Sequence, residues 1–182
     1  MSQEGSINDR DFGLVIAYLL PGFTALWALT YLTDALDPWF GQLPASPPTV
    51  GGFLYMTVAS IGAGITVSTV RWLVIDSLHR WTGLRPPQWD FSLLRDSVAA
   101  FGMIVDHQYR YYQFYGNSLV SLGAVFLARR WSLGFWTSWS AVDCGLIVLM
   151  IVFFLGSRDT LRRYYVRAGQ LLHKEKSRRA EE

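Results

Sequence analysis

The segment WTSWSAVDCGLIVLMIVFFLG, residues 136–156, decides the fold class of this chain. It contains a single charged residue, Asp143, and an uninterrupted apolar run from Leu146 to Leu155. A helix needs about 20 predominantly apolar residues to cross the hydrocarbon core of a bilayer, at about 1.5 Å of rise per residue. The segment therefore predicts a membrane-spanning helix.

Three other segments combine low charge with sufficient length: residues 12–33, 51–75 and 111–130. The third is the weakest, because its charge-free window is the shortest. Apolar residues make up 51% of the 182 residues and charged residues 16%, against about a quarter in soluble domains. The sequence predicts an all-α fold, an integral membrane four-helix bundle with a small helical cytoplasmic cap, as one membrane domain over 1–182.

Basic residues predict how these spans are oriented. The loop at 34–50 contains aspartates but no Lys or Arg, whereas the loop at 76–110 and the tail at 157–182 are rich in arginine. By the positive-inside rule, the basic segments lie in the cytoplasm, and four spans then place both termini there. The basic residues of the tail, which we expect to contact anionic lipids, are Arg158, Arg162, Arg163, Arg167, Lys174, Lys176, Arg178 and Arg179.

Two amphipathic helices are expected outside the bilayer. Downstream of Pro86 and Pro87, Asp90 is a suitable N-cap residue for the first of them. Its apolar stripe is Phe91, Leu94, Val98, Phe101 and Val105. The second lies in the tail beside the membrane, with the stripe Leu161, Tyr164, Ala168 and Leu171.

Polar groups inside the spans need partners. Pro21 removes a backbone donor from the first span, so we expect a kink there and a neighbouring helix that satisfies the freed carbonyl. Asn117 in the third span should likewise hydrogen-bond to another helix. It could also line a pore, but we favour the packing role.

Arg129 and Arg130 depart from the predicted orientation, because they fall in a connection that should face outward. If the third and fourth spans form a hairpin that turns near Phe135, Arg130 and Asp143 lie at equal depth. An unpaired carboxylate in an apolar span costs several kcal/mol, on the order of 3 or more. We therefore predict that Asp143 pairs with Arg129 or Arg130.

Small residues four positions apart form one face of the second span: Ala59, Ser60, Ala63 and Gly64. Such spacing lets another helix approach closely. The partner is either a helix of the same chain, which we favour slightly, or a second subunit of a homo-oligomer.

Two clusters flank the cytoplasmic loop: Asp76 with His79, and Asp106 with His107. Antiparallel spans would bring both clusters to one face of the membrane. Imidazole and carboxylate groups suit zinc, manganese or iron, and they can also serve acid–base chemistry.

Ordinary helix salt bridges are the favoured alternative, because Asp76 and Arg80, like Asp106 and Arg110, are four residues apart. The sequence contains no catalytic or cofactor-binding motif. The single cysteine, Cys144, excludes an internal disulfide, and a net charge of +2 gives no indication of a nucleic-acid partner.

Three stretches resemble a family of small uncharacterised bacterial four-span inner-membrane proteins: FGLVIAYLLPGF at 12–23, VRWLVIDSLHRWTGLRPPQWDF at 70–91 and YRYYQFYGN at 109–117. The resemblance implies a multi-pass protein of the bacterial inner (cytoplasmic) membrane. It implies no activity, but it suggests that residues 76–91 do more than connect two spans.

A small polytopic protein with little soluble mass usually works by assembling. We therefore expect an oligomeric membrane sensor, channel or pore-type effector, of the kind that bacteria use in stress responses or antiphage defence. One alternative is a membrane scaffold that recruits a cytosolic protein partner through the basic tail and the cytoplasmic loop. Another is a membrane enzyme that uses the paired Asp–His clusters.

Overall fold

The computed structural model describes residues 8–36, 40, 49–87 and 98–181, and side chains in the last helix as far as Leu172. The long helices are α1 (Asn8–Thr30), α3 (Val50–Trp81), α5 (Arg110–Leu133) and α6 (Ala141–Glu181). The short elements are the 3-10 helix η1 (Asp34–Leu36), α4 (Val98–Ile104) and the π-helical turn η3 (Val105–Tyr109). The predicted all-α fold is confirmed, since the described residues form helices and no strands.

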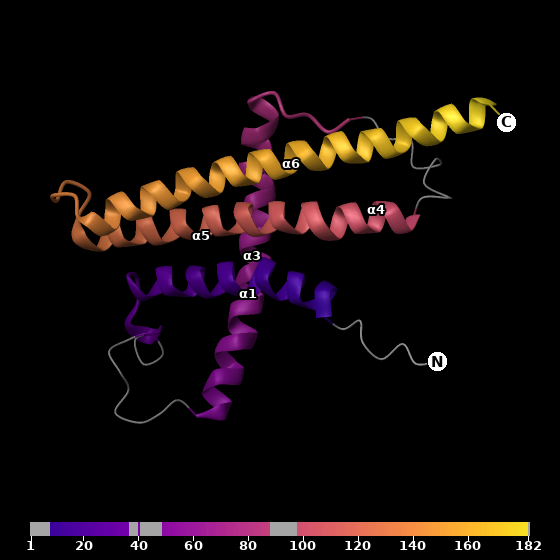
Figure 1. The fold of residues 1–182 in the computed structure, drawn as a ribbon. Helices are drawn as coiled ribbons and strands as arrows, with labels where there is room; N and C mark the ends of the chain where they lie inside the picture. Colours follow the sequence, from indigo (N-terminus) through magenta and orange to yellow (C-terminus); the bar gives the residue numbers. More distant parts are fainter. Residues whose placement is uncertain (1–7, 37–39, 41–48, 88–97, 182) are drawn as a thin grey trace.

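Three of the long helices form a layer in which α5 lies between α1 and α6 (Figure 1). α5 and α6 are an antiparallel hairpin, joined by the turn at residues 134–140. Gly134 begins this turn with a φ of +90°, a left-handed conformation that glycine adopts without a Cβ clash.

The remaining long helix, α3, runs across this layer (Figure 1). Along its length it meets α1 at Gly64, α5 at Asp76 and α6 at His79. Because these contacts follow one another in chain order, α3 passes over the three helices in turn. The four-span bundle therefore stays a prediction, since α3 crosses the other three helices and does not lie alongside them.

The crossing of α3 with α1 explains the small residues of the second predicted span. A Cβ atom on Gly64 would lie 2.1 Å from the Tyr18 carbonyl oxygen, and one on Gly22 would lie 1.8 Å from the Ser60 carbonyl oxygen. Ser60 and Gly64 are buried in this contact, while Ala59 and Ala63 are half-buried. Within the predicted face, Ser60 and Gly64 thus pack against the same chain.

Among the residues that the structure describes, two helices are long and apolar enough to cross a membrane: α3 and the Ala141–Leu172 part of α6. The apolar part of α1, Ile16–Thr30, is shorter. α5 is less apolar because it carries several polar side chains, which are buried at its central position in the layer. The buried polar residues of α5 are Asn117, Ser118, Ser121 and Arg130.

The two amphipathic helices expected outside the bilayer are continuations of longer helices. α4, η3 and α5 follow one another without a break, so the expected cap helix runs into the third predicted span. The proposed N-cap Asp90, with Phe91 and Leu94, lies outside the described residues. Backbone hydrogen bonding does not depend on the change from polar to apolar side chains, which is why one helix covers both.

The tail is likewise part of α6, which is one 41-residue helix about 61 Å long. Leu161, Tyr164 and Ala168 of the predicted stripe are buried. Leu161 and Tyr164 pack with Tyr112, and Ile104 and Val105 are among the residues around them. The stripe therefore covers the helical run before α5, and this helix pair (residues 98–109 and 157–172) is called the stalk below.

Candidate functional site

Polar contacts join α1 and α5 around Pro21. Because proline has no N–H group, the Ala17 carbonyl one turn earlier lacks its usual helical donor. The Asn117 side chain supplies that donor, with Nδ2 at 2.9 Å from the Ala17 oxygen. Ser121 adds a hydrogen bond of 2.7 Å to the Pro21 carbonyl. The interhelical bond expected of Asn117 is present, and α1 continues through Pro21.

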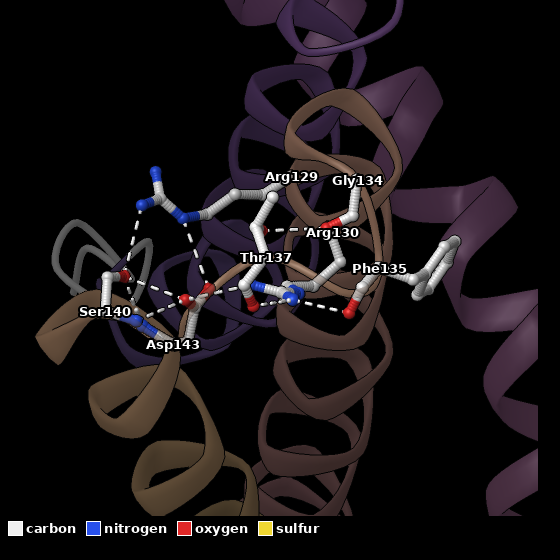
Figure 2. A network of polar contacts seen from close by, with 7 residues as sticks. All are labelled: Arg129, Arg130, Gly134, Phe135, Thr137, Ser140 and Asp143. Atoms are coloured by element: carbon white, nitrogen blue, oxygen red, sulfur yellow. Dashed lines mark hydrogen bonds and ion pairs between the residues drawn. The ribbon is translucent and has the colours of Figure 1, made fainter.

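A second network closes the turn between α5 and α6 (Figure 2). Asp143 is fully buried, and its two oxygens lie 3.3 Å from Arg129 Nε and 3.5 Å from Arg130 Nη1. The expected ion pair is present, and both arginines contribute to it. The turn brings residues of the two helices to the same level, as the hairpin argument required.

Local sequence also fixes the start of α6 at this turn. The Ser140 amide and hydroxyl both donate to Asp143 Oδ2 at 2.8 Å, and the Asp143 amide donates back to the Ser140 hydroxyl at 3.3 Å. This reciprocal pair is a capping box in which aspartate replaces the usual glutamate. The capping box explains why the helix begins at Ala141, whereas the predicted span began at residue 136.

The two arginines have a structural task in this turn. Arg130 Nη2 donates to the Phe135 and Thr137 carbonyls at 2.6 and 2.8 Å, and the guanidinium lies over the Trp139 ring. Arg129 Nη2 also donates to the Ser140 hydroxyl. These contacts satisfy carbonyls that the turn leaves without helical donors. Their role in the turn accounts for basic residues on the side predicted to face outward.

The third network, which we call the chamber, lies where α3 crosses α5 and α6. It is a polar cavity of about 180 Å³. The residues that line it are Trp72, Asp76, His79, Arg80, Leu84, Pro86, Tyr109, Tyr112, Leu161 and Tyr165. Asp76 accepts from the Tyr112 hydroxyl and from Arg71 Nη1, the latter at 2.9 Å.

Arg71 corrects one sequence-based expectation. Its side chain is buried over the Tyr112 ring. It also takes Asp76 as its partner, whereas Arg80 was expected to do so and instead donates to the Ser77 hydroxyl. The reason is space on α5, because a Cβ atom on Gly116 would lie 2.6 Å from Arg71 Cδ.

His79 lines the chamber from α3 and is fully buried. Its Nε2 atom lies 3.0 Å from the Ser157 hydroxyl, which itself donates to the Phe154 carbonyl at 2.9 Å. The hydroxyl oxygen therefore accepts from Nε2, and Nδ1 has no partner among the described residues.

The four candidate metal ligands are not brought together. His79 and Asp76 line the chamber, but Asp106 and His107 do not. Asp106 forms the expected ion pair with Arg110 at 2.9 Å, and the exposed His107 contacts the Met103 carbonyl through Nδ1. Across the described residues, no three His, Cys, Asp or Glu side chains are close enough to hold a metal ion.

Sequence reasoning missed Tyr112, which lines the chamber, and Ser157, which contacts His79. Ser157 lies 78 positions from His79, and Tyr112 lies 36 positions from Asp76, so no local spacing indicates either pair. No family model, curated protein or solved structure matches this chain.

Proposed function

We propose that this chain is a multi-pass protein of the bacterial cytoplasmic membrane that assembles into homo-oligomers and acts as a sensor or pore-type effector. In this proposal the apolar segments lie in the bilayer and the stalk projects into the cytoplasm. The protein performs no chemical step, and its three polar networks serve to hold the helices together.

The exposed apolar surface of α3 carries the proposal. Val50, Phe53 and Val58 are 78%, 67% and 68% exposed. Full burial of one such side chain is worth about 1.5–3 kcal/mol, which favours a lipid environment over water. The 32 residues of α3 extend about 48 Å, against a hydrocarbon core of about 30 Å.

The stalk supports a sensing role. Because α6 is about twice as long as the hydrocarbon core is thick, its charged half must lie outside the bilayer. That half packs on η3 and α4 through its own apolar cluster and stays connected to the membrane helices. A movement of the stalk would therefore reach α5 and α6 directly, without a flexible linker.

A groove between α1 and α3 supports assembly through a second copy. It has a volume of about 720 Å³ and a mostly apolar lining that includes Leu19, Ile61 and Ile65. Helices associate in lipid by close packing, since the solvent is itself apolar. We place the subunit contact here, with the exposed N-terminal half of α3 from one copy against the groove of the next.

Reconstitution into liposomes tests this function. Ile65→Trp fills the groove, while Val148→Trp on α6 is the matched control, because the two side chains are 57% and 58% exposed. Cross-linking in the bilayer should give oligomers for the parent protein and the control but monomers for Ile65→Trp. Ion flux should follow the same order if the oligomer is a pore.

Oligomers without flux under any condition would favour the sensor over the pore. Monomeric parent protein, or identical oligomers from both tryptophan variants, would contradict the proposed assembly.

A scaffold that recruits a cytosolic partner is the second candidate, favoured by the exposed arginines Arg162, Arg163 and Arg167 on the stalk. The two functions differ in their response to the simultaneous replacement of these three arginines by glutamine. A scaffold should lose its partner while its assembly is unchanged, whereas a pore should retain its flux.

A further inference from the structure

A second pocket, which we call the arginine pocket, lies where the chain leaves α3 and turns against α6. Its volume is about 320 Å³. Its lining residues are Thr82, Gly83, Leu84, Arg85, Arg158, Arg162, Tyr165 and Val166. Three arginines around so small a space concentrate positive charge at one point of the surface.

The end of α3 shapes one wall of this pocket. Gly83 has a φ of +91°, and the Leu84 amide donates to the His79 carbonyl at 2.9 Å, as in a glycine-terminated helix. This turn carries Arg85 back towards α6. The turn is held there by Arg158, whose Nη2 donates to the Thr82 carbonyl at 3.0 Å and whose Nη1 donates to the Thr82 hydroxyl.

The other wall is one face of α6. Arg158 and Arg162 are four residues apart, so they lie one above the other on the helix. Arg163 is adjacent in sequence but forms an ion pair with Asp159 at 2.8 Å and does not line the pocket.

The pocket arginines have no counter-charge of this kind. Among the carboxylates that the structure describes, Asp159 pairs with Arg163 and Asp76 pairs with Arg71. None pairs with Arg85, Arg158 or Arg162 within residues 49–87 and 98–172. Guanidinium groups bind phosphate through paired hydrogen bonds, so the complementary ligand is a phosphate group.

The position of the pocket along the helices indicates where such a phosphate comes from. Arg158 lies two residues after the end of the predicted span 136–156. Trp81, at the end of α3, is 90% exposed, as an aromatic side chain at the membrane interface would be. In the proposed orientation, this level is that of the lipid headgroups of the cytoplasmic leaflet.

We propose that the arginine pocket binds the headgroup phosphate of an anionic phospholipid. The inference rests on the membrane orientation in the proposed function, but not on the oligomer or on flux. Basic pockets on the cytoplasmic side of membrane helices are suited to anionic headgroups, and the acyl chains would lie against the exposed apolar surface of α3. Lipid bound here would also hold the stalk at a fixed height relative to the bilayer.

Native mass spectrometry of the delipidated full-length protein tests the site. The protein is titrated with phosphatidylglycerol and, separately, with phosphatidylcholine. Each arginine near an anionic lipid surface contributes about a fivefold gain in affinity. Arg162→Gln and Arg85→Gln should each reduce the preference for phosphatidylglycerol about fivefold, and the double variant about 25-fold. Both side chains are exposed, so folding should be unaffected.

Arg163→Gln is the matched control, because it removes the same charge one residue from Arg162 but outside the pocket. An equal loss in Arg163→Gln would overturn the site, since the effect would then be one of general charge. An unchanged preference in the double variant would overturn it as well.

Inorganic phosphate added at millimolar concentration separates the two sources of the ligand. The parent protein could bind inorganic phosphate, lose that binding in Arg162→Gln and show no preference for phosphatidylglycerol. That result would assign the pocket to a soluble phosphate compound and overturn the lipid proposal. Resistance of the protein to alkaline carbonate extraction from membranes is measured in parallel. Release of the protein from membranes by alkaline carbonate would count against the membrane function itself, independently of the pocket.

Discussion

Replacement of Asn117 by leucine should expose the requirement that Pro21 creates in α1. Asn117 is fully buried and gives its Nδ2 hydrogen to the Ala17 carbonyl at 2.9 Å. Leucine has a similar volume but no donor. The Ala17 oxygen would then be buried with neither a helical nor an interhelical partner, because proline at position 21 has no N–H group.

The expected magnitude follows from that unsatisfied carbonyl. A buried polar group without a partner costs about 1–3 kcal/mol, whereas an interhelical hydrogen bond in a membrane protein averages only about 0.6 kcal/mol. The larger figure applies because Pro21 cannot donate to the Ala17 carbonyl, and Asn117 Nδ2 donates to it instead. We therefore expect Asn117→Leu to lower the free energy of unfolding by about 2 kcal/mol.

A double-mutant cycle isolates this effect from changes in packing. Pro21→Ala restores the N–H group at position 21, which can donate to the Ala17 carbonyl within α1. In that background, Asn117→Leu should cost at least about 1 kcal/mol less than in the parent protein. Losses of packing occur in both backgrounds and cancel.

Unfolding in mixed micelles with increasing denaturing detergent, followed by circular dichroism, gives the four free energies. Equal costs for Asn117→Leu in the two backgrounds would refute the reasoning, because the asparagine would then contribute packing alone.

Two further predictions concern the other contacts. Gly64→Ala should destabilise the protein by about 1–3 kcal/mol, because the new Cβ would lie 2.1 Å from a carbonyl oxygen of α1. Gly62→Ala is the control and should be neutral or slightly stabilising, because its Cβ would meet nothing within 4 Å. The same detergent titration compares them, and equal effects would contradict the close crossing. Asp143→Asn should lower stability clearly more than Asp159→Asn, since Asp143 is buried against two arginines and the Asp159 side chain is 57% exposed.

The sequence by itself determined that the chain is helical and where apolar segments lie. Hydropathy is a property of neighbouring residues, so segments such as 51–75 and 136–156 could be identified without knowledge of the fold. The same holds for local chemistry, since the spacing of Ser140 and Asp143 matches a capping box. The sequence also indicated that Asn117 and Asp143 would need partners, because an unpaired polar group in an apolar segment is costly.

The tertiary structure decided which partners these groups have. His79 meets Ser157, and Asp76 meets Tyr112, through the crossing of α3 over the layer, and neither contact has a signal in local spacing. Asp76 pairs with Arg71 and not with Arg80, because Gly116 of α5 leaves room for the Arg71 side chain.

Helix direction was also decided at the tertiary level. Gly22 and Gly64 allow the backbones of α1 and α3 to come into contact. This contact fixes where the two helices cross, which amino-acid composition does not predict. Hydropathy likewise separated the predicted span 136–156 from the tail at 157–182, although the backbone continues through Ser157 as one helix. The physical reason is the same in both cases: polarity belongs to each segment alone, whereas packing and polar contacts depend on which segments the fold brings together.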